Sequence, residues 1–224
     1  MTTRARRALH RLGEQCRALL GPAAEAIRRR RYERLWSGPA AALSVAGLAV
    51  AARTGPGHTF IAGYAITHPG DPLPATLARL PLSLFAPAAL LPYWFAMLQV
   101  LVVFSAAQAL LGLRRTIAVA VLGHGLATLS APLWVAAGPP LGLDHRYAGL
   151  ADAGPSAAVV ALLAYAAVSR RAVWLAAALV AYHGTEVVIV GGLAPREHLV
   201  GTLTGAAAAL LAPAGTTEPG GAPP

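Results

Sequence analysis

The chain has 224 residues, of which 56% are hydrophobic and 12% are charged, and its formal net charge is +9. A soluble domain usually carries about 25% charged residues, so this composition argues against a soluble globular protein and favours a membrane protein. The only cysteine, Cys16, excludes an internal disulfide.

Residues 1–35 predict a basic, partly amphipathic helix on the cytoplasmic face of a membrane. The segment holds ten of the eighteen basic residues, all of them arginine, including the run Arg28 to Arg31. A basic block directly before an apolar segment is typical of a cytoplasmic arm that binds anionic lipid. We expect no binding of nucleic acid, because no interleaved aromatic residues or known reader motif accompany the charge.

Residues 36–212 predict a membrane domain with six spanning helices. The expected spans cover residues 39–52, 92–111, 116–137, 155–168, 172–190 and 198–211. Residues 53–75 are expected to form a loop, and the proline-rich tract up to Leu91 an interfacial or re-entrant segment. Residues 213–224 are rich in Gly, Pro and Thr, and we expect them to be disordered. The predicted fold is an all-α, six-helix transmembrane bundle.

The arginines are divided unequally between the two sides of this predicted bundle. With the amino terminus in the cytoplasm, fourteen of the eighteen lie on the inner side, and the outer side keeps Arg53, Arg79, Arg146 and Arg196. Inner loops of membrane proteins carry an excess of basic residues. We therefore expect a multi-pass protein of the cell membrane with a cytoplasmic amino terminus.

Two polar residues stand at the outer ends of the fourth and sixth predicted spans. Ser156 and His198 each precede about fifteen apolar residues, which cover roughly 22 Å of a hydrocarbon core near 30 Å thick. Both side chains are therefore expected at a similar depth, roughly 10 Å below the outer face. A hydroxyl and an imidazole at one depth suit a nucleophile and its general base.

The segments around these two residues resemble the rhomboid family of intramembrane serine proteases. Gly154-Pro155-Ser156-Ala157 resembles the family motif G-x-S-G, and the run His198, Gly201, Gly205 matches H-x-x-G-x-x-x-G. The resemblance covers most of residues 38–212. It implies Ser156 as nucleophile, His198 as base, and Gly154, Gly201 and Gly205 as helix-packing glycines. It also implies transmembrane segments as substrates or clients, and neither a metal nor a cofactor.

The oxyanion positions depart from the family pattern. Aligning Phe95-Ala96-Met97 with the second rhomboid helix puts Pro92 and Ala96 where the family carries an H-x-x-x-N pair. Loss of one oxyanion donor typically costs about 10²–10³ in rate. His183, with Glu186 one turn away, is the candidate replacement donor, although an internal helix–helix hydrogen bond is its alternative role. Asp152 is expected to cap or support the helix that begins near Ser156.

Three functions remain open from the sequence. The first is a rhomboid-like intramembrane serine protease, and the second is a catalytically inactive pseudoprotease that binds membrane clients, as the lost oxyanion donors suggest. The third is a metal-dependent membrane hydrolase whose ligands would be His183, Glu186, His198 and Asp152. The presence of both Ser156 and His198 favours the protease.

Overall fold

The computed structural model describes residues 3–86, 92–139 and 142–212. These residues form an all-α protein with nine α-helices, which confirms the predicted fold class at that level. The helices are α1 (Thr3–Arg28), α2 (Ser37–Ala51), α3 (Gly55–Tyr64), α4 (Leu73–Ser83), α5 (Tyr93–Leu111), α6 (Leu113–Ala137), α7 (Ser156–Ser169), α8 (Val173–Ile189) and α9 (Leu193–Leu211). Short 3-10 helices cover Tyr32–Arg34 and His145–Gly149. The predicted tail, 213–224, and the end of the predicted interfacial tract lie outside the described residues.

Six helices, α2 and α5 to α9, correspond to the six predicted spans, and the largest difference is at α9. That helix begins at Leu193, five residues before the predicted start at His198. The prediction of a loop over 53–75 is wrong, because α3 and the first turn of α4 lie there. The side chain of Thr54 accepts a hydrogen bond of 3.1 Å from the Gly57 N–H, and Pro56 occupies the first turn. Both features are typical of helix starts.

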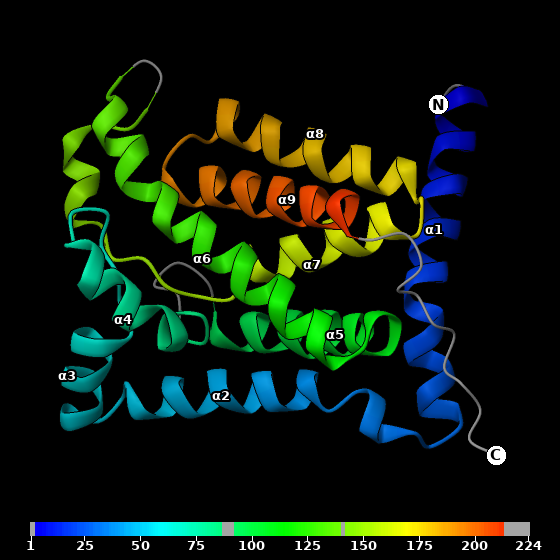
Figure 1. The fold of residues 1–224 in the computed structure, drawn as a ribbon, viewed down its shortest axis with the longest axis horizontal. Helices are drawn as coiled ribbons and strands as arrows, with labels where there is room; N and C mark the ends of the chain where they lie inside the picture. The colour runs from blue at the N-terminus through cyan, green and yellow to red at the C-terminus, as the bar shows by residue number, and fades with distance from the viewer. Residues whose placement is uncertain (1–2, 87–91, 140–141, 213–224) are drawn as a thin grey trace.

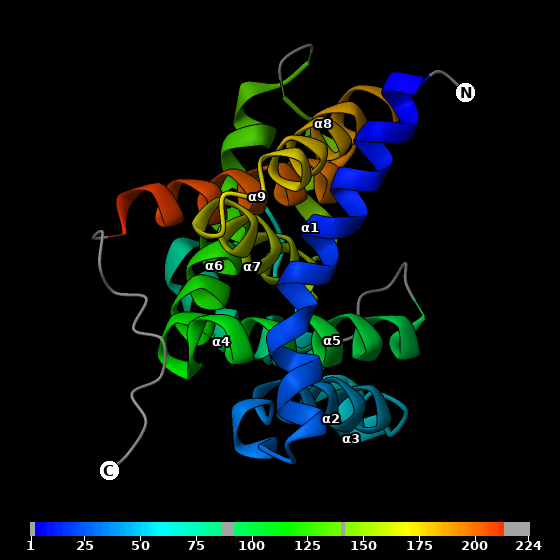
Figure 2. The same ribbon diagram turned by 90° about the vertical axis from the view of Figure 1, so that its right-hand side faces the viewer.

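Six central helices lie between α1 on one side of the molecule and α3 and α4 on the other (Figure 1). Helices α2, α5, α7, α8 and α9 run across the view, with α6 inclined to them, while α3 and α4 cover one side. Helix α1 covers the opposite side, and Figure 2 looks onto it as it crosses the bundle. The central helices therefore have one set of ends on the side of the molecule that carries α1 and the other set towards α3 and α4, and α1 itself contacts α5, α7 and α8.

Helix α7 forms the centre of the bundle. It is apolar around its whole circumference, and such a helix is stable only when every face is covered. Ten of its residues are buried, from Ala157 to Ala167. Its neighbours in the core include Val45 of α2 and Val100 and Phe104 of α5. Because α7 begins at Ser156, the core fixes the place of that residue.

Close approach of α7 and α9 depends on glycine, as the motif predicts. A Cβ atom at Gly201 would lie 2.7 Å from the Ala157 carbonyl oxygen, and one at Gly205 would lie 2.0 Å from the Ala161 oxygen. The residue numbers rise together along the two helices, from the Gly201–Ala157 contact to the Gly205–Ala161 contact, so the helices run parallel. Gly154 differs from the prediction: it lies ahead of α7 in a turn with a φ of 122°, a backbone conformation that favours glycine.

Helix α1 packs against the bundle through only a small part of its apolar side. Leu19 and Ala26 are buried, whereas Leu9, Leu20 and Ile27 remain exposed. The Leu175 N–H in the first turn of α8 donates a hydrogen bond of 2.9 Å to the Gln15 side chain. The basic helix thus lies across the bundle with apolar side chains still uncovered.

Two helices, α5 and α6, are long and apolar enough to cross a bilayer by length and composition. The buried core helix of a soluble protein can meet the same criterion, so these two helices do not establish a membrane location.

Candidate functional site

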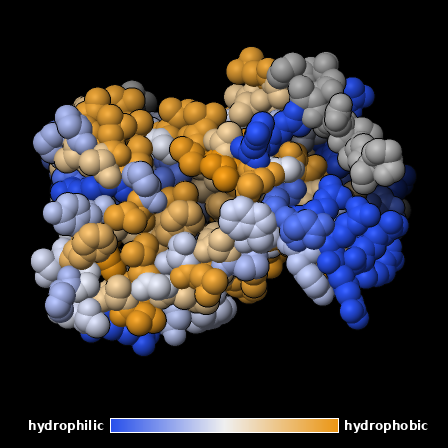
Figure 3. All heavy atoms as spheres, turned by 60° about the horizontal axis from the view of Figure 1, so that its bottom comes forward, coloured by the Kyte–Doolittle hydropathy of each residue, from blue (hydrophilic) through white to orange (hydrophobic). Residues whose placement is uncertain are grey.

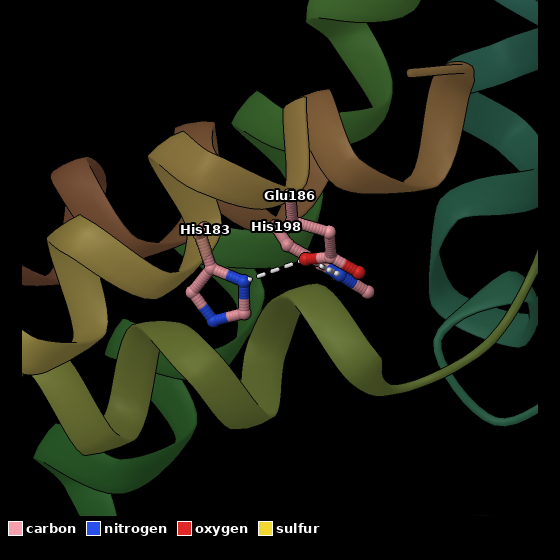
Figure 4. Close-up of side chains that lie close together, drawn as sticks. All are labelled: His183, Glu186 and His198. Carbon is pink, nitrogen blue, oxygen red and sulfur yellow. Dashed lines mark hydrogen bonds and ion pairs between the residues drawn. The ribbon is translucent and has the colours of Figure 1, made fainter. Parts of the chain in front are cut away.

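Three side chains from two helices form a polar cluster between α8 and α9 (Figure 4). His183 and Glu186 lie one turn apart on α8, and His198 extends from the second turn of α9. The Glu186 Oε2 atom lies 3.0 Å from His183 Nδ1 and 3.4 Å from His198 Nδ1. The two imidazole rings are 5.4 Å apart at their centroids. One carboxylate therefore faces both histidines, and it orients His198 through Nδ1.

Ser156 lies at the same end of the α7–α9 interface as His198. Ala157 of α7 faces Gly201 of α9. Ser156 immediately precedes this contact on α7, and His198 precedes it by about one turn on α9. Among the residues that the structure describes, no hydrogen bond joins Ser156 to His198. The structure thus brings His183, Glu186 and His198 into contact and places Ser156 nearby on the adjacent helix.

The turn before Ser156 is held by a buried hydrogen-bond chain from α4 and α6. The Gly154 N–H donates to the Ser83 carbonyl oxygen at 2.8 Å. The Ser83 hydroxyl oxygen lies 2.8 Å from His124 Nε2, and both side chains are buried. His124 therefore has a structural role, and these two hydrogen bonds connect α6 and α4 to the turn just before Ser156.

We expect Ser83→Ala to destabilise the protein by about 1–3 kcal/mol, because the change leaves the buried His124 nitrogen without its partner. Ser44→Ala is the matched control: its exposed hydroxyl donates only to Ala40 in its own helix, and we expect a change within about 0.5 kcal/mol. Unfolding midpoints in detergent would compare the two variants. Equal midpoints for both would show that the Ser83–His124 contact adds nothing to stability.

Asp152 does not cap α7, contrary to one of its predicted roles. Helix α7 has Pro155 at its N-cap position and no side-chain cap. The backbone of Asp152 instead pairs with Thr67 in an isolated antiparallel bridge, and its carboxyl lies against the Glu197 carboxyl. Burial raises the pKa of Asp152 above its ordinary value.

Glu197, in the second turn of α9, carries a buried carboxyl. Its side chain is covered by the protein, and its Oε1 atom has no hydrogen-bond partner in the described part of the chain. Two carboxylates in an apolar setting cannot both carry a charge without strong repulsion. The Asp152 and Glu197 carboxyls lie together near the starts of α7 and α9.

The positions aligned with the rhomboid oxyanion pair have no side-chain donor. Pro92 is the N-cap residue of α5, and Ala96 is buried in the core. The first N–H groups of α7 offer another source, since the first turn of a helix leaves its N–H groups without intrahelical acceptors. His183 lies against Glu186 and next to His198.

Comparison of the chain with protein-family models, with curated proteins and with solved structures finds no match. The likeness to rhomboids rests on the motifs alone. The features of the chain that bear on function are the two residue pairs Ser156–His198 and His198–Glu186 and the arrangement of the six central helices.

Proposed function

We propose that the chain is a rhomboid-like, six-span membrane protein that hydrolyses peptide bonds of transmembrane segments with Ser156 and His198. The contact between His198 Nδ1 and Glu186 Oε2 is the observation that supports the hydrolytic role most directly. It holds the imidazole so that Nε2 is available as a base, which is the function of the third member of a catalytic triad.

The membrane location is supported by apolar side chains on the outer faces of the central helices. Soluble monomers rarely expose large contiguous apolar patches. On α5 and α6 the exposed large apolar residues include Leu98, Leu101, Val102, Ile117, Val121, Leu122, Leu126 and Leu133, and the first turn of α5 adds Tyr93, Trp94 and Phe95. Figure 3 shows apolar side chains spread over the flank of the bundle and a hydrophilic cluster at the end that carries α1. A bilayer around the flank would cover the apolar side chains.

The arginines support one orientation of this bundle. The pairs Arg114-Arg115 and Arg170-Arg171 lie at helix ends on the side of α1, whereas Arg53 and Arg79 lie by α3 and α4. Anionic lipid at the cytoplasmic surface attracts the α1 side. The proposed orientation therefore has α1 in the cytoplasm and α3 and α4 outside.

A cysteine-labelling experiment tests this topology. In a Cys16→Ser background, we expect His58→Cys on α3 to react with a membrane-impermeant maleimide in intact cells, and Arg170→Cys to react only after permeabilisation. Both positions are exposed in the structure, so access is decided by the membrane. Equal labelling of both positions before permeabilisation, or release of the protein by alkaline carbonate, would contradict the proposed topology.

In the proposed reaction, Ser156 Oγ attacks the carbonyl carbon of the scissile peptide bond and its proton moves to His198 Nε2. The tetrahedral intermediate then collapses: the C–N bond breaks, and the leaving amine takes the proton from His198. Water then attacks the acyl ester and gives a proton to His198 Nε2. As the ester C–O bond breaks, His198 returns that proton to Ser156 Oγ, and the carboxylic acid product is released. The N–H groups in the first turn of α7 stabilise the oxyanion in place of the absent side-chain donors.

A client-binding pseudoprotease is the second candidate. It is favoured by the absence of donors at Pro92 and Ala96 and by the lack of a Ser156–His198 hydrogen bond among the described residues. Such a protein would use the same membrane bundle to hold transmembrane clients. Cleavage of a reconstituted transmembrane peptide by the wild type, lost in Ser156→Ala, separates the two functions: binding without cleavage in the wild type would favour the pseudoprotease.

A further inference from the structure

We propose that His183, Glu186 and His198 form a binding site for a single Zn²⁺ ion. One nitrogen from each imidazole and one oxygen of the carboxylate lie within 4.8 Å of one another. Two histidines and one glutamate are a ligand set that zinc uses in proteins, with metal–ligand distances of about 2.0–2.2 Å. Small side-chain adjustments bring three atoms at this spacing onto one ion.

The surroundings of the three side chains favour binding of an ion. The relative exposure of the His183 side chain is 6%, that of Glu186 is 20%, and that of His198 is 18%. His183 and Glu186 come from one turn of α8, so the helix sets the spacing between them. The packing of α9 against α7 sets the position of His198. The ligands are therefore held in place by rigid elements, and the partial exposure of two of them leaves access for an ion.

The same geometry determines which nitrogen binds. In the structure both Nδ1 atoms face Glu186 Oε2, so Zn²⁺ would take the position between them and replace the hydrogen bonds to the carboxylate. A histidine that binds through Nδ1 as a neutral imidazole carries its proton on Nε2.

A regulatory consequence follows for the proposed hydrolysis, and this consequence rests on the proposed function. The Nε2 atom of His198 is the one that must accept the proton of Ser156. With Zn²⁺ bound to Nδ1, the Nε2 atom of His198 already carries a proton and cannot act as a base. Zinc is therefore expected to inhibit the serine, whereas binding of the metal itself does not depend on hydrolysis.

Metal binding is measured by competition between the purified, metal-free protein in detergent and a chromophoric zinc chelator. We expect one Zn²⁺ per chain in the wild type, and affinity weakened about tenfold or more by His183→Asn and by Glu186→Gln. His145→Ala removes an exposed histidine outside the cluster and is expected to keep wild-type affinity. Because Glu186→Gln conserves side-chain volume, it gives a second test if His183→Asn fails to fold.

Wild-type protein that does not compete with the chelator would overturn the zinc site, as would binding that both cluster variants leave unchanged. The failures of the two proposals are distinguishable. Zinc binding without a reactive serine supports the metal site and contradicts the hydrolytic function. A reactive serine without zinc binding overturns the metal site alone, and a serine whose labelling saturating Zn²⁺ does not reduce overturns the inhibitory consequence.

Discussion

Gly205→Leu is expected to prevent stable folding, and Gly205→Ala to cost about 3 kcal/mol or more. A Cβ at position 205 would lie 2.0 Å from the Ala161 carbonyl oxygen and 2.9 Å from its Cα, so the neighbour that must move is backbone. Ala161 cannot retreat easily, because on its other side it contacts Gly123 of α6. The substitution therefore separates three helices at the centre of the bundle.

Gly184→Ala is the matched control for this prediction. Gly184 also lies within a helix of the bundle, but a Cβ there would meet no atom within 4 Å. Because alanine is the better helix former, this change is expected to stabilise the protein by up to about 1 kcal/mol. Unfolding in detergent, followed by circular dichroism, compares the two. Equal midpoints for Gly205→Ala and Gly184→Ala would contradict the close α7–α9 contact.

The apolar pattern predicted the helices of the bundle well, because apolar runs and their boundary residues are local features. Helix α5 was predicted from residue 92 and begins at Tyr93, directly after the proline that marks its start. Helix α3 was missed because its glycines and proline suggest a loop, although Thr54 and Pro56 are ordinary start signals.

The early start of α9 could not be predicted from local sequence. Arg196 and Glu197 suggest a polar connector, yet both belong to the helix. The Arg196 guanidinium donates to the Gly192 and Gly142 carbonyl oxygens and lies over the Trp134 ring. Glu197 is covered because it meets Asp152. Charged residues enter a helix of the bundle here because tertiary contacts with Gly142, Trp134 and Asp152 hold part of each side chain, and those contacts come from residues distant in the chain.

The candidate site was predictable only in part. The spacing of His183 and Glu186 places them one turn apart, and the structure confirms their contact. That His198 would meet the same carboxylate depends on how α8 packs against α9, which no local pattern encodes. The third hypothesis from the sequence also included Asp152 with these residues, but the structure pairs Asp152 with Thr67 and Glu197 instead.

Replacement of Ser156 or His198 is expected to abolish hydrolysis, the largest functional effect in this account. Ser156→Ala removes the nucleophile, and His198→Ala removes the base that activates it. Glu186→Gln keeps the shape of the side chain but loses the negative charge that orients and stabilises the imidazolium. We expect it to lower turnover by about 10²–10⁴, the range that a positioned acid–base group contributes. Turnover of a reconstituted transmembrane peptide measures all three variants.

Ser169→Ala is the control for the serine variant, because Ser169 ends the same helix and its hydroxyl donates to the Ala166 carbonyl oxygen in that helix. It is expected to retain wild-type turnover. Loss of activity in Ser169→Ala equal to that in Ser156→Ala would show that the assay reports on the integrity of α7 rather than on a nucleophile.

The most direct test of the central claim is covalent labelling of the purified, folded protein by a fluorophosphonate, which reacts with activated serines. We expect one label per chain in the wild type and in Ser169→Ala, and none in Ser156→Ala or His198→Ala. A folded wild-type protein that takes no label, or a Ser156→Ala variant that is labelled as fully as the wild type, would contradict the assignment of Ser156 as the nucleophile.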